Sequence, residues 1–231
     1  MAEEDSISEE INRFRISRCE ARDTVDIRHR ILWPNHPIEH VLLPDDEHGF
    51  HFALYLDRSG SQGMDASSTV IGVISFFLEE IPQNYDPGAN APDPTDGMTS
   101  PSVAVNSTAL DGSSVVRSIR FRKFALLPEY QGQGLGTRLL KESMALAVVA
   151  ASALPASSSL VSEYSTTNTP SPAPDPESRV IIKYAWCDAR ESAMPFYAKR
   201  GMRELLLRGG KSDRFFKGDI PYMKMVMDVG I

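Results

Sequence analysis

A short glycine-rich segment is the part of this sequence whose residue types most directly imply chemistry. Residues 131–136 read Gln-Gly-Gln-Gly-Leu-Gly, and the alternating glycines remove side chains where the backbone must turn sharply between a predicted strand and a predicted helix. Such a turn exposes N–H groups at a helix N-terminus, where these donors and the helix dipole attract phosphate. The spacing differs from the dinucleotide fingerprint, whose third glycine lies one residue later, and no Gly-Lys-Ser/Thr follows as in a P-loop. The segment therefore predicts an anion site of another kind.

The charges around this segment favour the same interpretation. Residues 117–141 contain six basic residues and one acid, in a chain whose net charge is −7. Arg138 and Lys141 fall within the first two turns of the predicted helix, from which they could reach phosphate oxygens. The alternative is a tight glycine turn surrounded by solvated charges.

The predicted elements that position this segment describe an α/β domain with a mixed sheet. Alternating or β-rich patterns predict strands, and 3.6-residue periodicity predicts helices. The expected strands are residues 11–18, 50–56, 70–78, 118–127, 180–186, 202–207 and 222–229, and the expected helices are 24–32, 134–151 and 192–200. Gly201 follows the last helix, where a C-terminal capping glycine belongs. Helices separate strands late in the chain, which is typical of a mixed sheet.

Composition excludes several classes of protein. The 231 residues include only two cysteines, which rules out a disulfide scaffold and a zinc site of three or four thiolates. The histidine spacing matches no compact metal pattern, so no metal is expected. The acidic balance argues against nucleic acid, and no apolar stretch is long enough to span a membrane. Because the N-terminus is acidic where a secretion signal would be basic and then apolar, we expect a soluble protein that is cytoplasmic or otherwise intracellular.

Two segments differ in composition from the rest of the chain. Residues 82–116 and 152–178 are rich in Ser, Thr, Pro and Asp, and they contain no Lys or Arg. Such segments cannot bury enough apolar surface to offset the entropy of ordering. We therefore expect a single domain, residues 1–231, with long, largely disordered insertions at 82–116 and 152–178.

Two motifs together resemble a known family. The Gln-x-x-Gly-x-Gly segment, after a strand and Pro-Glu-Tyr, is similar to the acetyl-CoA loop of the GCN5-related N-acetyltransferases. Residues 193–202, Ala-Met-Pro-Phe-Tyr-Ala-Lys-Arg-Gly-Met, resemble the family's Ala-x-x-Phe-Tyr-x-Lys-x-Gly-Phe segment. Residues 186–193, Trp-Cys-Asp-Ala-Arg-Glu-Ser-Ala, resemble the Trp-Cys-Asn-Ala-Arg-Glu-Ser-Ala of small bacterial-type members. The resemblance spans about residues 12–229 without the insertions, and it implies a twisted, mostly antiparallel mixed sheet of about seven strands flanked by helices.

The resemblance also implies where acetyl-CoA binds. The loop N–H groups would hold the pyrophosphate, and the exposed main chain of the preceding strand would pair with the pantetheine arm. The implied cofactor-binding residues are Phe124, Ala125, Leu126, Leu127, Gln131, Gly132, Gln133, Gly134, Leu135, Gly136, Thr137 and Arg138. The Leu126 N–H is the candidate to polarise the thioester carbonyl.

Tyr197 matches the family's position for the general acid that protonates the leaving thiolate. The alternative is a half-buried tyrosine that only packs on the cofactor arm. Two departures stand out. Arg190 replaces an asparagine that many members use to contact pantetheine, and no glutamate lies on strand 118–127 as a general base. Four carboxylates near strand ends are eligible bases, as is a chain of waters, and the sequence does not choose among them. They are Glu79, Glu80, Asp188 and Glu191.

The predicted function is transfer of an acyl group, in the first place acetyl from acetyl-CoA, directly to a primary amine of an unidentified acceptor. The alternative is a catalytically weak acyl-CoA sensor or assembly module with the same fold. A nucleotide-binding regulator that uses the same glycine loop is a third class. The acceptor, the acyl chain preference and the oligomeric state do not follow from the sequence.

Overall fold

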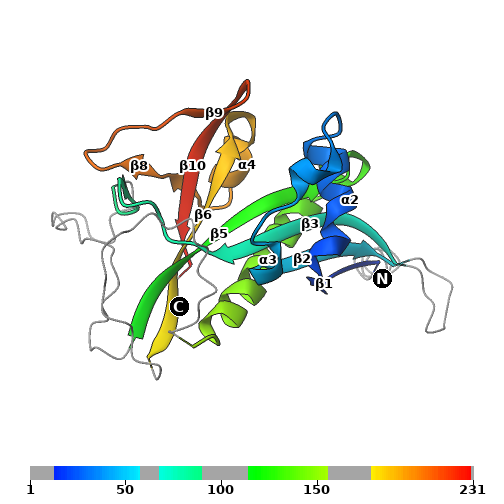
Figure 1. Cartoon of the computed structure of the whole chain (residues 1–231), viewed down its shortest axis with the longest axis horizontal. Helices are drawn as coiled ribbons and strands as arrows, with labels where there is room; N and C mark the ends of the chain where they lie inside the picture. The colour runs from blue at the N-terminus through cyan, green and yellow to red at the C-terminus, as the bar shows by residue number, and fades with distance from the viewer. Residues whose placement is uncertain (1–12, 58–67, 90–113, 156–177, 230–231) are drawn as a thin grey trace, which may run out of the picture. The chain divides into compact units, whose positions relative to one another are not determined.

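The computed structural model describes residues 13–57, 68–89, 114–155 and 178–229 (Figure 1). Residues 90–113 and 156–177, the larger parts of both predicted insertions, lie outside these ranges.

Most strands belong to one mixed sheet. The strands are β1 (Phe14–Cys19), β2 (Phe50–Leu56), β3 (Thr69–Leu78), β4 (Tyr85–Asp86), β5 (Ser114–Leu126), β6 (Arg179–Arg190), β7 (Arg203–Glu204), β8 (Leu206–Leu207), β9 (Phe215–Lys217) and β10 (Ile220–Asp228). Eight of them form a sheet in the order β1-β2-β3-β5-β6-β10-β7, with β9 paired to β10, while β4 and β8 form a separate two-stranded sheet. β5 and β6 are parallel, and the pairs β1·β2, β2·β3 and β6·β10 are antiparallel. This confirms the expected mixed, mostly antiparallel α/β sheet.

The chain divides into two compact units. Unit 1 comprises residues 1–76 and 122–147, and unit 2 comprises residues 77–121 and 148–231. β3, β5 and the helix α3 (Leu135–Ser152) therefore each contribute residues to both units.

In unit 1, helix α2 (Ala21–Leu32) packs on β2 and on the 3₁₀ turn η1 (Ile38–Val41). Glu20 and Asp23 form a reciprocal capping box at its start, in which the Glu20 N–H donates to the Asp23 carboxylate at 3.0 Å. Ile27 provides the buried apolar contact of this helix. The helix ends before Pro34, as predicted, because proline cannot continue it.

A buried polar network fixes four elements of unit 1 to one another. Arg28 of α2 is fully buried and donates to both oxygens of Asp46, at 2.7 and 2.9 Å, in the 3₁₀ turn η2 (Asp46–His48). Arg28 also donates to the Ser75 hydroxyl of β3 at 2.8 Å. The Ser75 hydroxyl lies 2.8 Å from Nδ1 of His51 in β2, and His51 Nε2 lies 2.6 Å from the Asp46 carbonyl. A carbonyl can only accept, so Nε2 carries the proton and Nδ1 accepts from Ser75.

Helix α3 and β5 both pack closely against Gly72 of β3. A Cβ at this position would lie 2.8 Å from a Leu126 methyl, 3.1 Å from a Leu139 methyl and 3.2 Å from the Ala125 carbonyl. A side chain at Gly72 would therefore require the Leu126 and Leu139 side chains to shift. No helix within the described residues, α3 included, is long and apolar enough to cross a membrane.

In unit 2, β6 and β10 run side by side as an antiparallel pair, from Tyr222 opposite Arg190 to Asp228 opposite Tyr184 (Figure 1). A hydrophobic cluster forms around this pair. Its buried members are Tyr85, Tyr184, Trp186, Leu205 and Val226. Tyr85 lies within the first predicted insertion, and β5 begins at Ser114 inside it as well, so both ends of that segment belong to the folded part of the chain.

The other differences from expectation are local. The strand expected over 202–207 is two short strands, β7 and β8, and the helix expected over 192–200 is a 3₁₀ turn followed by α4 (Met194–Ala198). The strand expected over 180–186 continues to Arg190, and β9 was not predicted. Gly201 has φ of +85°, and the N–H groups of Gly201 and Met202 donate to the carbonyls of Ala198 and Tyr197. This is the Schellman pattern, which confirms the predicted capping glycine.

Candidate functional site

The glycine loop of unit 1 forms an open backbone turn at the start of α3. Gly132 and Gly134 have φ of +77° and +80°, in the left-handed region that L side chains rarely adopt. A Cβ at either position would meet nothing within 4 Å, so the space above the loop is open to an incoming group. A side chain there would occupy the space that a bound phosphate needs.

The first turn of α3 presents N–H groups toward this space. The first intrahelical bond joins the Arg138 N–H to the Gly134 carbonyl at 3.1 Å. The N–H groups of residues 134–137 therefore have no acceptor four residues earlier within the helix. Gly134 also brings no capping side chain. Amides directed outward at the positive end of a helix are the group that a phosphate prefers.

The strand before the loop contains an unusual backbone turn. Lys123 has φ of +54° and is the one non-glycine residue with positive φ in the described chain. Beyond it, the Leu127 N–H donates to the Ile71 carbonyl of β3 at 2.9 Å. Because N–H groups alternate along an extended strand, the Leu126 N–H points to the opposite edge. On that edge the Leu126 carbonyl accepts from the Gln131 side chain at 2.9 Å.

These contacts show which of the predicted site residues of unit 1 use their polar groups within the protein. Leu126 directs its N–H away from β3, as a thioester contact requires, whereas the N–H of Leu127 is used within the sheet. Arg138, expected to reach a phosphate, donates to Glu142 one turn later at 2.8 Å, and Lys141 is exposed. A phosphate would therefore have to draw Arg138 out of an exposed ion pair, which costs little.

Tyr197, the predicted acid, lies on α4 in unit 2. Its ring packs 5.7 Å from the ring of Phe121 and 5.2 Å from that of Phe196, and its side chain is buried. Burial, together with nearby Cys187 and Tyr222, raises the pKa of the Tyr197 phenol well above 10. The phenol therefore keeps its proton at neutral pH, and it releases that proton less readily than an ordinary tyrosine does.

The parallel pairing next to Tyr197 ends early. The β5·β6 register runs from Ser114 opposite Arg179 to Arg120 opposite Trp186. In unit 2 it does not include the next residues, Phe121 and Cys187, although both strands continue.

The carboxylate of Asp188 is surrounded by cations. Asp188 of β6 accepts from Arg120, from Lys217 at 2.7 Å and from Lys224 at 2.9 Å. Burial by itself would raise the Asp188 pKa, but the positive charges of Arg120, Lys224 and Lys217 outweigh it and hold that pKa well below the usual range. A carboxylate held in this way binds protons weakly, which makes Asp188 a poor general base.

The other three candidate bases also differ in their surroundings. Glu79 is buried and bonded to Arg120 at 2.5 Å, and exposed Glu191 is bonded to Arg214 at 2.7 Å. Glu80 has a raised pKa, because burial outweighs the lowering effects of Arg117 and Ser118. Glu80 is therefore the candidate whose proton affinity the fold increases.

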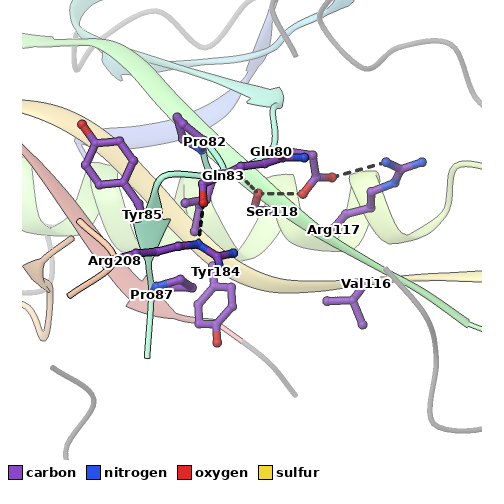
Figure 2. A pocket seen from close by; sticks show the side chains of 11 residues that line it. Glu80, Pro82, Gln83, Tyr85, Pro87, Val116, Arg117, Ser118, Tyr184 and Arg208 are labelled. Atoms are coloured by element: carbon purple, nitrogen blue, oxygen red, sulfur yellow. Dashed lines mark hydrogen bonds and ion pairs between the residues drawn. The ribbon is translucent and has the colours of Figure 1, made fainter. Parts of the chain in front are cut away.

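Glu80 also faces a hollow within unit 2 (Figure 2). The hollow holds about 20 Å³, room for a water-sized group, and it is lined by apolar residues such as Pro82 and Val116 and by polar ones such as Gln83 and Arg208. The Glu80 carboxylate lies 3.3 Å from an Arg117 nitrogen and 3.3 Å from the Ser118 hydroxyl. Dashed lines mark both contacts in Figure 2.

Both cysteines are unsuited to nucleophilic chemistry. Burial, assisted by Asp23, raises the pKa of the Cys19 thiol to about 12. Burial also raises the pKa of Cys187 well above its ordinary value. Because the thiolate is the nucleophile, neither residue offers an acyl-enzyme route at neutral pH.

Comparison with known proteins adds to this geometry. No family model and no curated protein sequence match the chain. A candidate N-acetyltransferase from Lactobacillus plantarum matches with a TM-score of 0.50 at 12% identity, over 94% of this chain and 98% of the other. A bacterial toxin matches with a TM-score of 0.50 at 14% identity, over 94% and 90%. An IAA acetyltransferase from Bacillus cereus gives a TM-score of 0.46 at 11% identity, over 94% and 99%. The chain has the fold of the GCN5-related N-acetyltransferases.

Within this acetyltransferase fold, several residues of the candidate site carried no signal in the sequence. Lys123 adopts positive φ with no glycine or asparagine to mark the turn. Lys217 and Lys224 lie 29 and 36 residues beyond Asp188, so that only the pairing of β10 with β6 and of β9 with β10 brings them to it.

Arg190, which departs from the family pattern, ends β6 with its Nε 3.3 Å from the Tyr222 hydroxyl. Among the described residues, no group of three or more His, Cys, Asp or Glu side chains could hold a metal ion.

Proposed function

We propose that this protein is an acyl-CoA-dependent N-acyltransferase that transfers acetyl from acetyl-CoA directly to a primary amine. One observation carries the proposal: an open turn with positive-φ Gly132 and Gly134 at the start of α3, on the fold of the acetyltransferases. The thioester of acetyl-CoA supplies the activated acyl group, and every other task falls to the chain itself.

The glycine loop would bind the pyrophosphate of the cosubstrate. The N–H groups at the start of α3 donate to phosphate oxygens, and the helix dipole adds to the attraction. Gly132 and Gly134 keep side chains out of the approach path.

The Leu126 N–H would donate to the thioester carbonyl oxygen. Its direction, away from β3, follows from the bond between the Leu127 N–H and Ile71. A donor held rigidly against developing negative charge contributes a few kcal/mol in other enzymes, about 2.7–4 kcal/mol in the case measured most directly.

Two further groups would donate and accept the protons of the reaction. The amine nitrogen attacks the carbonyl carbon, the C–S bond breaks, and the departing thiolate takes a proton from the Tyr197 hydroxyl. Burial keeps that hydroxyl protonated. The proton lost by the amine passes along a chain of waters, and Glu80 is the candidate carboxylate to receive it, because its pKa is raised.

The test is CoA binding measured by isothermal titration calorimetry. We expect Gly134→Glu to weaken binding at least about tenfold, because it adds a carboxylate where phosphate must lie. Gly210→Glu is the matched control, since Gly210 has φ of +77°, against +80° for Gly134, and is equally open. Equal affinities for the wild type and Gly134→Glu would refute the loop assignment.

Turnover separates the proposal from its alternative. Release of free thiol from acetyl-CoA, measured with a panel of primary amines, identifies a transferase and its acceptor class. CoA binding without turnover on any amine would favour an acyl-CoA sensor. That alternative is supported by the ion pairs of Glu79, Asp188 and Glu191, which leave one candidate base with raised proton affinity.

A further inference from the structure

The segment between α2 and β2, residues 33–49, contains two adjacent aspartates that are bound by different parts of unit 1. Asp46 is held by Arg28 in the buried network. Its neighbour Asp45 contacts Arg122 of β5 instead, with its two carboxylate oxygens 3.3 and 3.4 Å from one guanidinium nitrogen. One aspartate thus anchors the segment to α2, and the other connects it to the strand that leads to the glycine loop.

The contact between Asp45 and Arg122 is shielded from solvent. The side chains are 11% and 16% exposed. Partly buried charges are screened little by salt, and removing one partner leaves the other poorly solvated. The pair therefore constrains Arg122 more firmly than a surface ion pair would.

Arg122 immediately precedes the strained turn at Lys123. A lysine at φ of +54° adopts a conformation that persists only where its surroundings hold it. On the far side, the bond from the Leu127 N–H to the Ile71 carbonyl fixes the chain again. The turn and the Leu126 N–H thus lie between two anchors, the Asp45 carboxylate before them and Ile71 after them, in a strand that also borders β3.

We propose that Asp45 is a positioning residue of this protein, which through Arg122 holds the backbone turn at Lys123 and so the strand edge that carries the Leu126 N–H. The catalytic part of this inference rests on the proposed acyltransferase function. Asp45 itself does not touch the reacting atoms in this scheme, because its carboxylate is directed to Arg122. Loss of the anchor affects the stretch between the two anchors and leaves the glycine loop, which follows Leu127, in place.

Hydrogen exchange tests the anchor without any need for activity. In Asp45→Asn we expect the amides of residues 123–127 to exchange about tenfold faster than in the wild type. Glu47→Gln is the matched control, because it removes an equal charge two residues away whose side chain is 79% exposed and does not contact Arg122. Exchange at residues 123–127 that is the same in Asp45→Asn and Glu47→Gln would overturn the proposal. Arg122→Gln provides an independent second variant, in which the same acceleration is expected.

Kinetics test the consequence for catalysis. Asp45→Asn and Arg122→Gln are each expected to lower kcat about tenfold while the KM for acetyl-CoA changes less than twofold. Arg122→Lys, which keeps the charge that Asp45 binds, is expected to retain most of the wild-type kcat. A general loss of stability would instead lower activity in both Arg122→Lys and Arg122→Gln and would contradict the proposal. If the wild-type protein transfers no acyl group, the acyltransferase function fails, while the exchange experiment still decides whether Asp45 holds the turn.

Discussion

Tyr197 and Cys187 are both buried in unit 2, and burial raises the pKa of each group by disfavouring its charged form. The chemical consequences are opposite. A phenol that stays protonated is prepared to act as an acid, whereas a thiol that stays protonated is no nucleophile. Motif and packing together leave both roles of Tyr197 open, because a buried phenol that keeps its proton can act as an acid or only pack against Phe121 and Phe196.

Replacement of Tyr197 by phenylalanine tests the acid role. The ring contacts with Phe121 and Phe196 can remain, so only the hydroxyl is lost. We expect kcat for thiol release to fall about 100-fold, the usual scale for a general acid, with CoA affinity unchanged. Tyr55→Phe serves as control, since burial also raises the pKa of Tyr55 but the residue lies on β2 outside the candidate site. A kcat reduced equally in both variants would leave the hydroxyl of Tyr197 without a catalytic role.

The four eligible carboxylates make a second prediction at single residues. Glu80 is the one whose pKa is raised, and Asp188 is the one whose pKa is lowered. We expect Glu80→Gln to lower kcat about 100-fold and Glu191→Gln, at an exposed ion pair, to have little effect. Parallel kinetic measurements on the two variants decide the assignment. Activity lost only in Glu191→Gln would transfer the role of base to that residue.

At the scale of elements, the Arg28 network shows how four short pieces of unit 1 depend on one neutral histidine. His51 accepts from Ser75 through Nδ1 and donates to the Asp46 carbonyl through Nε2. Protonation of Nδ1 would remove the acceptor for Ser75 and place a cation beside Arg28, whose nearest nitrogen is 3.4 Å away. The charges that face His51 are Arg28 from α2, Asp46 from η2 and Arg18 from β1.

The network predicts a loss of stability on acidification. Burial, with smaller contributions from Arg28 and Arg18, lowers the pKa of His51 in the folded state, while Asp46 opposes the shift. In the unfolded chain His51 titrates near 6.5. As pH falls through 6.5 the unfolded state takes up a proton that the folded state does not, so the free energy of unfolding decreases.

We therefore expect the Tm difference between pH 7.5 and pH 5.5 to be smaller in His51→Gln than in the wild type. His48→Gln, at a half-exposed histidine of the same segment, should keep the wild-type difference. The measurement is thermal unfolding followed by circular dichroism at both pH values. A His51→Gln protein whose Tm depends on pH as strongly as the wild type would contradict this account.

Elements with strong periodicity could be predicted from the sequence, and elements defined by tertiary pairing could not. β2 matches its expected range at both ends, and α3 differs by one residue at each end, because alternation and helical spacing mark both. β4, β8 and β9 are two or three residues long and carry no period of their own. The start of α2 was placed three residues late, since its capping box uses Glu20 where Ser, Thr, Asp or Asn is usual.

The candidate site divides in the same way. The glycine loop could be predicted because its backbone conformation requires glycine. The helix that carries Tyr197 could be predicted because it contains a recognisable motif. The Asp45–Arg122 contact and the cations around Asp188 join residues at least 29 positions apart or on separate strands, and nothing local in the sequence pairs them.

At the scale of the whole molecule, the two units share three elements. β3, β5 and α3 each begin in one unit and end in the other. If one unit unfolded alone, each shared strand or helix would be broken partway along its length. The half that stayed folded would lose the cooperative support of the other half. The units are therefore expected to unfold in one transition.

The two tryptophans of the chain make this expectation testable, because Trp33 belongs to unit 1 and Trp186 to unit 2. Trp186→Phe leaves fluorescence that reports on unit 1, and Trp33→Phe leaves fluorescence that reports on unit 2. Trp186 is buried and donates to the Glu79 carbonyl at 2.9 Å, so its replacement lowers stability, and each variant must be compared with itself. We expect the urea midpoint by fluorescence to equal the midpoint by circular dichroism in both variants, as one cooperative transition requires. If Trp33 fluorescence and circular dichroism gave separate midpoints in Trp186→Phe, unit 1 would be unfolding independently despite the elements that it shares with unit 2.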